Sequence, residues 1–169
     1  METNRLLIDC LRESDKEDYF INISHDKKVL ETFICNYEED LEKFDFQKYL
    51  NRSDLFAIRL KENSKLIGII LYFDEKEGSC EIGYGIGSRY WNNGYVTEAV
   101  NKFLEFCFIE KNLNTVYASF FIGNDASKRV MEKNGMKFNR YSYKELVYKG
   151  IERDLIYYSI TKDEWDKLR

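Results

Sequence analysis

The sequence has few of the residues on which metal and redox sites depend. His25 is its only histidine, and its four cysteines are widely spaced, with no C-x-x-C pair. Zinc sites use closely spaced Cys and His ligands, so the sequence predicts no metal site. His25 also lies far from the motifs described below, and we do not expect it to be catalytic. The cysteines are expected to be reduced packing residues; they are Cys10, Cys35, Cys80 and Cys107.

Long apolar segments and an excess of positive charge are also lacking. No apolar run is long enough to span a bilayer, and the N-terminus has no apolar signal segment, so we expect a cytoplasmic protein without membrane contact. The formal net charge of −4 argues against non-specific binding of nucleic acid, which needs a basic surface. A local basic pocket remains compatible with that charge.

The chain has no internal repeat, no low-complexity tract and no linker-like segment. Its 169 residues fit one domain with a sizeable core, and we expect that domain to span 1–169. A hydrophobic content of 44% and a charged content of 33% are typical of a soluble globular protein.

Two common nucleotide-binding motifs are absent, although one glycine loop is suited to phosphate. The segment Tyr90–Ala99 has no Gly-Lys-Ser/Thr ending, and Asn92 and Val96 stand where a G-x-G-x-x-G motif would need glycine. Gly94 nevertheless joins a strand-like run to an amphipathic helix. The unpaired N–H groups at such a helix start suit a phosphate or diphosphate. A plain turn after a strand is the alternative interpretation.

A second polar helix start follows about one strand later, in Asn124–Met136. Asn124 is a good N-cap residue, and Ser127 falls in the first turn of the expected helix. Gly135 is placed to end the helix in a left-handed conformation. This segment therefore predicts a short helix that presents polar groups at its start.

Hydrophobic periodicity predicts an alternation of strands and helices. The helix from Tyr95 to Lys111 is the clearest, because its apolar residues follow helical spacing. We expect helices between about Glu13 and Leu50, including the acidic stretch Tyr37–Phe44, and at Asn124–Asn134. Strands are expected at Leu6–Leu11, Leu55–Leu60, Lys65–Phe73, Ser79–Ile86, Thr115–Ile122, Phe138–Tyr148 and Ile151–Ile160. This order implies a mixed α/β sheet.

Together the two polar segments resemble the cofactor-binding motifs of the GNAT superfamily of N-acetyltransferases. The resemblance is closest to the branch of the ribosomal-protein alanine acetyltransferases. The motifs that carry the resemblance are Glu81-Ile82-Gly83-Tyr84, Tyr90-Trp91, Gly94-Tyr95, Thr97-Glu98-Ala99, and Asn124-x-x-Ser127 followed by Glu132-Lys133-x-Gly135. The layout matches along the whole chain, whereas the specific motifs lie only in its second half.

Three residues depart from the pattern of that branch. Asn92 stands where glycine is usual, Val96 where glycine or alanine is usual, and Ser88 where proline is common. Asparagine tolerates positive φ better than other side chains, so Asn92 is expected to keep the turn of the loop. Val96 is expected to crowd the cofactor and to weaken its binding.

The resemblance implies a single α/β domain with a splayed mixed sheet of six or seven strands, flanked by about four helices. It implies that acetyl-CoA lies in the splay between Ser79–Ile86 and Thr115–Ile122, with its pantetheine arm along the first of these strands. It implies no metal. The implied cofactor-binding residues are Tyr84, Gly85, Ile86, Trp91, Asn92, Asn93, Gly94, Tyr95, Val96, Thr97, Asn124 and Ser127.

Acyl transfer to an amine needs a neutral amine, a polarised thioester carbonyl and a proton for the thiolate. Glu81 is the candidate base, although its side chain could equally face solvent. A backbone N–H near Gly85–Ile86 is the candidate for holding the carbonyl. The wider superfamily often uses a tyrosine as the acid, but Met131 occupies that position here, so Ser127 is the candidate acid. A helix-capping role is the alternative for Ser127.

The expected function is therefore transfer of an acetyl group from acetyl-CoA to a primary amine by direct attack in a ternary complex. A non-catalytic acyl-CoA-binding or sensing module on the same fold is the alternative. An interaction protein without a cofactor would leave both polar helix starts unexplained. Acceptors left open include a protein or peptide N-terminus, a polyamine, an amino sugar and a small toxic amine. A homodimer is suggested by the resemblance and by no residue.

Two other groups of residues have simpler interpretations than catalysis. The acidic residues between Glu38 and Glu42 are expected to be solvated surface, although they would favour a cationic acceptor if they bordered its groove. Tyrosines of the last hairpin are expected to be half-buried cross-strand packing residues, of which one or two could touch substrate. They are Tyr141, Tyr143, Tyr148, Tyr157 and Tyr158.

Overall fold

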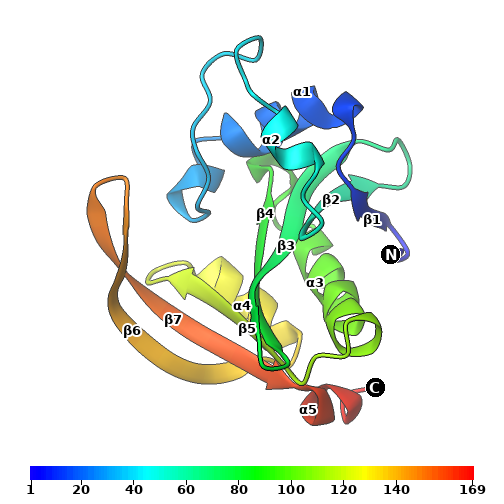
Figure 1. Ribbon diagram of the computed structural model, residues 1–169, viewed down its shortest axis with the longest axis vertical. Coiled ribbons are helices and arrows are strands. Elements are labelled where there is room, and N and C mark those ends of the chain that lie inside the picture. Colours follow the sequence, from blue (N-terminus) through cyan, green and yellow to red (C-terminus); the bar gives the residue numbers. More distant parts are fainter. The chain divides into compact units, whose positions relative to one another are not determined.

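The computed structural model describes residues 1–169 as seven strands and five α-helices, with single turns of 3-10 or π helix between them. The strands are β1 (Leu6–Cys10), β2 (Leu55–Leu60), β3 (Leu66–Lys76), β4 (Ser79–Ile86), β5 (Thr115–Phe121), β6 (Lys137–Tyr148) and β7 (Ile151–Thr161). The helices are α1 (Lys16–Tyr19), α2 (Gln47–Leu50), α3 (Tyr95–Glu105), α4 (Asp125–Lys133) and α5 (Lys162–Asp166). Figure 1 labels these elements along the chain.

The strands form one sheet in the order β1-β2-β3-β4-β5-β7-β6. β4 and β5 pair in parallel, and the β1–β2, β2–β3, β5–β7 and β6–β7 pairs are antiparallel. The expectation of a mixed α/β sheet of six or seven strands is thus confirmed. The chain also divides into two compact units, Met1–Leu71 with Tyr84–Lys102, and Tyr72–Gly83 with Phe103–Arg169.

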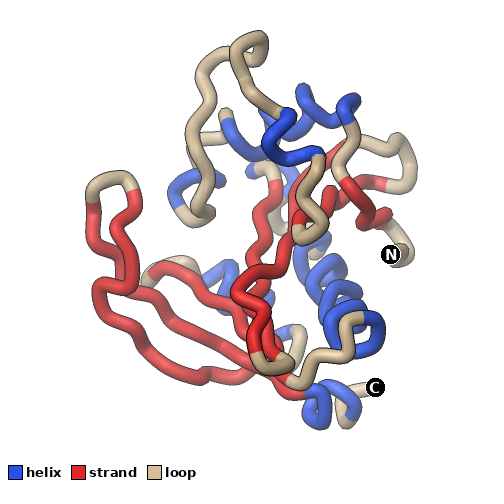
Figure 2. The backbone as a smooth tube through the Cα atoms, in the orientation of Figure 1, coloured by secondary structure: helices blue, strands red, loops and turns tan.

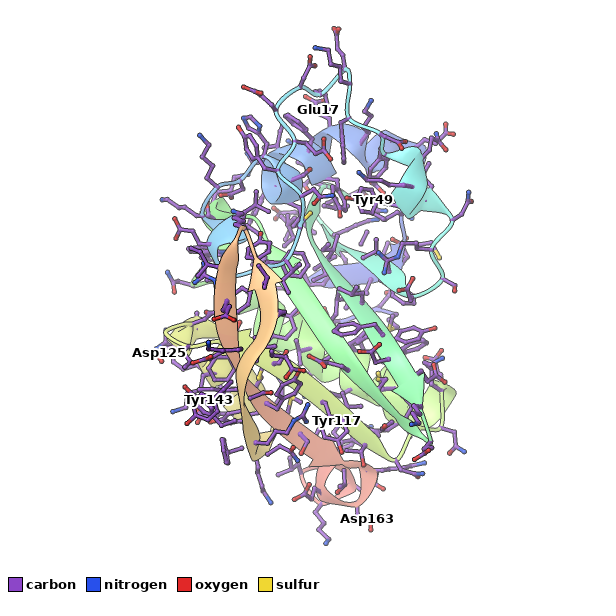
Figure 3. All side chains as sticks on the ribbon, turned by 60° about the vertical axis from the view of Figure 1, so that its left-hand side comes forward. Glu17, Tyr49, Tyr117, Asp125, Tyr143 and Asp163 are labelled. Atoms are coloured by element: carbon purple, nitrogen blue, oxygen red, sulfur yellow. The ribbon has the colours of Figure 1, made fainter.

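The first unit is built around an aromatic core. Tyr19, Phe44 and Phe46 are almost fully buried, and the ring of Tyr49 on α2 lies 4.9 Å from that of Tyr19. Figure 3 labels Tyr49 among the side chains of this region. Burying a large apolar side chain contributes about 1.5–3 kcal/mol, which explains how these short helices are held in place. None of the helices of the protein combines the length and the apolar character that a membrane span requires.

The helix expected over Tyr37–Phe44 is absent, and this prediction is wrong. Figure 2 shows the stretch as loop, with turns only at its end. Asp40 accepts a hydrogen bond from the backbone N–H of Glu42 at 2.9 Å, and such local bonds compete with helix formation. Phe44 is buried by the aromatic core rather than by a helical face.

The second unit contains the long β6–β7 hairpin, which Figure 1 shows in orange and red. Its turn is Lys149-Gly150, as expected, and both residues have positive φ. Of the hairpin tyrosines, Tyr157 and Tyr158 are buried, but Tyr143 is 75% exposed. Figure 3 labels Tyr143 on this hairpin. The expectation of half-buried packing is therefore wrong for Tyr143.

Most of the predicted elements have the expected positions. α3 buries Ala99, Val100, Phe103 and Leu104 completely, although it ends at Glu105 and a π turn continues to Glu110. The four cysteines are free, but Cys10 is exposed and is not a packing residue. α5 was not expected from the hydrophobic pattern.

Candidate active site

The loop between β4 and α3 has the geometry of a bared helix start. Asn92 and Gly94 have φ values of 63° and 77°, so Asn92 adopts the positive φ expected of it. The first bond of the helix runs from the N–H of Glu98 to the carbonyl of Gly94 at 3.1 Å. The amides of Tyr95 and Val96 precede that bond and have no carbonyl within the helix to pair with.

Side chains within the loop hold its shape. The amide of Asn93 donates to the carbonyls of Tyr90 and Trp91 at 3.1 and 2.9 Å. The indole N–H of Trp91 donates to the carbonyl of Ile86 at 2.9 Å and ties the loop to the end of β4. Residues 91–94 are exposed. The structure therefore brings the expected loop residues next to the expected end of the strand.

Arg5, directly before β1, anchors this loop, and the sequence motifs did not indicate it. Its guanidinium donates to Glu98 at 2.7 Å and to the carbonyl of Asn93 at 3.0 Å, and it lies 4.4 Å from the ring centroid of Tyr95. Burial acts to raise the pKa of Glu98, but hydrogen bonds from Thr3 and Arg5 outweigh it and hold that pKa below its usual value. Glu98 is thus ionised and fixed at the first turn of α3.

The end of β4 has two distinct edges. The N–H of Gly87 donates to the carbonyl of Ile67 on β3 at 2.9 Å. Backbone N–H and C=O groups point to alternate edges along a strand. Those of Gly85 therefore also point toward β3, and those of Tyr84 and Ile86 point toward the opposite edge. The N–H of Ser88 is taken by the carboxylate of Asp26 at 2.7 Å.

Phe33 covers one face of β4 at Gly85. A Cβ at Gly85 would lie 3.1–3.3 Å from the Phe33 ring, so any larger residue there would require the ring to shift. Phe33, Asp26 and Ser88 join the expected residues Tyr84–Ile86 in the first unit. No motif or spacing in the sequence indicated Phe33 or Asp26.

In the second unit, Asn124 and Ser127 form a reciprocal pair at the start of α4. The side-chain oxygen of Asn124 accepts from the backbone N–H of Ser127 at 3.2 Å, and its amide donates to the Ser127 hydroxyl oxygen at 3.0 Å. The N-cap role of Asn124 is confirmed. The Ser127 hydroxyl oxygen is the acceptor in this bond, and an acid at this position would supply the hydroxyl proton.

Removing this cap is expected to destabilise the protein measurably. Asn124→Ala loses the bond to the Ser127 amide, which should cost about 1 kcal/mol and lower Tm by about 2–4 °C in a chain of this size. Asn124→Asp keeps an oxygen that can accept from that amide and should retain most of the stability. Equal losses in the two variants, measured by thermal denaturation, would contradict a stabilising cap.

Glu81 is partly buried, and its carboxylate is hydrogen-bonded rather than free in solvent. Its carboxylate accepts a hydrogen bond from the hydroxyl of Ser119 on β5 at 2.5 Å. Burial, its largest influence, raises the pKa of Glu81 above the usual value, and the Ser119 hydroxyl acts in the opposite direction. A partly buried carboxylate with a raised pKa is a better proton acceptor than an exposed one.

Met131, which the resemblance aligns with a proton-donating tyrosine, is only 1% exposed and is the buried residue of α4. A thioether has no proton to give, so it is a packing residue. No group of three or more His, Cys, Asp and Glu side chains is arranged to hold a metal ion.

Comparisons with known proteins bear on the family and the fold of the chain. Residues 5–137 match the model of the acetyltransferase (GNAT) domain. The N-acetyltransferase YnaD of Bacillus subtilis is 34% identical over 131 residues, which are 76% of each chain. A GNAT-family acetyltransferase from Bacillus anthracis superposes with a TM-score of 0.85 at 28% identity and covers 96% of this chain and 98% of its own.

A third comparison shows the fold at lower identity. The spermidine N-acetyltransferase of Vibrio cholerae, solved with CoA and spermine, has a TM-score of 0.80 at 16% identity and covers 96% of this chain and 99% of its own. The family model spans most of the chain, and the seven-stranded mixed sheet agrees with it. The chain therefore belongs to the GNAT family of acetyltransferases.

Proposed function

We propose that the protein transfers an acetyl group from acetyl-CoA to a primary amine, by direct attack of the neutral amine in a ternary complex. The observation that carries the proposal is the partly buried Glu81 carboxylate, held by Ser119 and raised in pKa, on β4 of a GNAT fold. Such a group suits the removal of a proton from an ammonium substrate. The solved relative from Vibrio cholerae that contains CoA and spermine is consistent with this chemistry.

We assign the diphosphate of CoA to the start of α3, where the amides of Tyr95 and Val96 precede the first bond of the helix and Thr97 completes the first turn. Helix N-termini attract phosphate through their unpaired N–H groups and their positive dipole end. Asn92, Asn93 and Gly94 shape the exposed approach to these amides, and Trp91 fixes the loop to Ile86. Arg5 lies at the same loop and adds positive charge, although Glu98 offsets part of it.

We assign the pantetheine arm to the edge of β4 that faces away from β3, at Tyr84 and Ile86. The N–H of Ile86 is our candidate for holding the thioester carbonyl, because Gly85 is directed to β3. Charge develops on that oxygen when the amine attacks, and an oriented backbone N–H stabilises it.

Two side chains handle the protons of the reaction: Glu81 is the candidate base, and Ser127 is the candidate acid. Glu81 accepts the proton of the attacking amine, directly or through a water molecule. Ser127 or the amide of Asn124 meets the departing thiolate, with Ser127 as the candidate proton donor. The branch suggested by the motifs points to an N-terminal amine of a peptide or protein as the acceptor, and small amines remain the second acceptor class.

Saturating acetyl-CoA is expected to stabilise the protein strongly. A ligand at 100 times its Kd adds about 2.7 kcal/mol, and at about 2–4 °C per kcal/mol for this chain length Tm should rise by roughly 5–10 °C. Stabilisation together with CoA release across a panel of amines supports the enzyme. Stabilisation without product from any amine favours a non-catalytic acyl-CoA-binding module, and no stabilisation refutes both.

A pair of glycine variants localises that binding. Gly94 and Gly150 both lie in turns, with φ values of 77° and 73°. Alanine at either position costs a similar backbone strain, about 1–2 kcal/mol, and meets no atom closer than 3.6 Å. Gly94→Ala should weaken acetyl-CoA binding at least several-fold, whereas Gly150→Ala should not. Equal Kd values for the two variants, from isothermal titration, would place the diphosphate elsewhere.

A further inference from the structure

A row of polar side chains crosses four strands of the second unit. Glu81 on β4 is in register with Tyr117 on β5, so alternation places Ser119 on the face that Glu81 occupies. Figure 3 labels Tyr117 on this strand. Ser119 is paired with Tyr157 on β7, and Tyr157 is paired with Arg140 on β6. The row is therefore set by strand register and not by chance contact of mobile side chains.

We infer that Ser119 is a positioning residue, which holds one oxygen of the Glu81 carboxylate so that the other receives the proton of the amine. The inference rests on the proposed function. The Ser119 hydroxyl donates to Oε1 of Glu81 at 2.5 Å, a distance typical of a strong bond to a charged acceptor. Oε2 is then the oxygen that takes the proton.

The charges around Glu81 explain why such a donor is needed. Burial raises the pKa of Glu81, Asp74 on β3 and Glu145 on β6 raise it further, and Arg140 lowers it. The Ser119 hydroxyl is the second-largest influence and favours the ionised form. Without the Ser119 hydroxyl, burial and the two neighbouring carboxylates would all oppose ionisation of Glu81. Among these groups, only Arg140 would then favour it. Ser119 thus favours the ionised form of a partly buried carboxylate without adding a neutralising charge.

Tyr157, next in the row, has a different partner. Its hydroxyl donates to Glu145 at 3.3 Å, and the Arg140 guanidinium lies 3.6 Å from its ring centroid. Burial, followed by the charges of Glu81 and Glu145, raises the pKa of Tyr157 to about 12. Tyr157 therefore stays protonated near neutral pH, and its buried ring lies beside Ser119 on the neighbouring strand. The tyrosine does not substitute for Ser119 as the donor to Glu81.

The test measures the titration of Glu81 directly and then its effect on rate. Carboxyl carbon NMR of the full chain labelled with ¹³C-glutamate gives the Glu81 midpoint, with Glu81→Gln identifying the signal. Removing a hydrogen bond to the ionised form in Ser119→Ala should raise that midpoint by about one pH unit. The acidic limb of the kcat/KM profile should move upward by the same amount.

Two matched variants separate positioning from a structural role. Ser119→Thr retains the hydroxyl and should restore both midpoints to within a few tenths of a unit, and it also serves if Ser119→Ala folds poorly. Ser79→Ala removes a hydroxyl from β4 that donates to the carbonyl of Lys76, and it should shift neither midpoint.

The outcomes distinguish this inference from the proposed function. An unchanged Glu81 midpoint in Ser119→Ala overturns the inference even if the protein acetylates amines. A threonine variant that behaves like alanine overturns it as well. A shifted midpoint in a protein that turns over no amine supports the coupling of Ser119 to Glu81 and refutes the proposed function.

Discussion

Replacing Glu81 with glutamine is expected to lower kcat/KM for an N-terminal amine by at least about 100-fold near pH 6.5, since a positioned base contributes roughly 10²–10⁴-fold. Glutamine keeps the size and polarity of the side chain and can still accept from Ser119, but it cannot take a proton. The measurement is CoA release from acetyl-CoA with a peptide that begins with alanine, over a range of pH.

The pH dependence of this deficit carries more information than its size. The variant depends on amine that is already neutral, a fraction that rises from roughly 3% near pH 6.5 to roughly 76% near pH 8.5 for a pKa near 8. The deficit should therefore narrow roughly 25-fold over that range for an N-terminal amine. An amine with a pKa near 10.4 is only about 1% neutral near pH 8.5, so its deficit should remain large.

Glu152→Gln is the matched control for this experiment. Glu152 lies on β7 and forms an exposed ion pair with Lys144 at 2.9 Å, so its loss should leave the rate unchanged. An unchanged pH–rate profile in Glu81→Gln would remove Glu81 from the mechanism. The same profiles, recorded with a peptide and with a polyamine, would also separate the two acceptor classes.

Local patterns were sufficient to predict the elements that surround the candidate site. α3 was predicted because its apolar residues share one face, and the structure buries that face completely from Ala99 to Leu104. β4 has the expected bounds, and α4 begins at its expected N-cap, Asn124. In each case the residues that predict the element lie within one segment, and most of the interactions that form the element lie there too.

Elements held by distant contacts were predicted less well. The stretch Tyr37–Phe44 has helical spacing, yet its burial comes from rings of Tyr19, Phe46 and Tyr49 that lie elsewhere in the chain. α5 was missed although its start carries a local signal, since Thr161 and Glu164 form a capping box. The helix over Tyr37–Phe44 was wrongly predicted because tertiary packing determines the conformation there. Helix α5 was missed because its capping box was not used as a signal.

The candidate site shows the same division. Glu81 could be selected from its strand and its family motif, but its partner Ser119 lies 38 residues away. Their contact depends on the parallel register of β4 with β5, which alternation within either strand cannot specify. Arg5 is 93 residues from Glu98, and no pattern linked them. The candidate catalytic residue could therefore be named from the sequence, whereas the residues that contact it or the loop from distant segments could not.

Arg59 gives the largest expected effect on stability. It is 1% exposed in β2, and its guanidinium donates to Asp9 at 2.7 Å, to both carboxylate oxygens of Asp15, and to the carbonyl of Cys10 at 3.1 Å. Asp15 is itself 3% exposed. Arg59→Met fills most of the volume but leaves the Asp15 carboxylate buried without its cation, which typically costs about 3–5 kcal/mol.

Thermal denaturation should therefore show Arg59→Met melting roughly 10 °C below the natural chain, at about 2–4 °C per kcal/mol for this length. Arg52→Met is the matched control, because Arg52 makes a similar two-bonded pair with Asp54 that is 39% and 30% exposed. Exposed pairs contribute about 0–1 kcal/mol, so this variant should melt within a few degrees of the natural chain. Adding Asp15→Leu to Arg59→Met should recover part of the loss, since it removes the stranded charge. Equal melting temperatures for Arg59→Met and Arg52→Met would show that burial of the pair adds nothing to its effect.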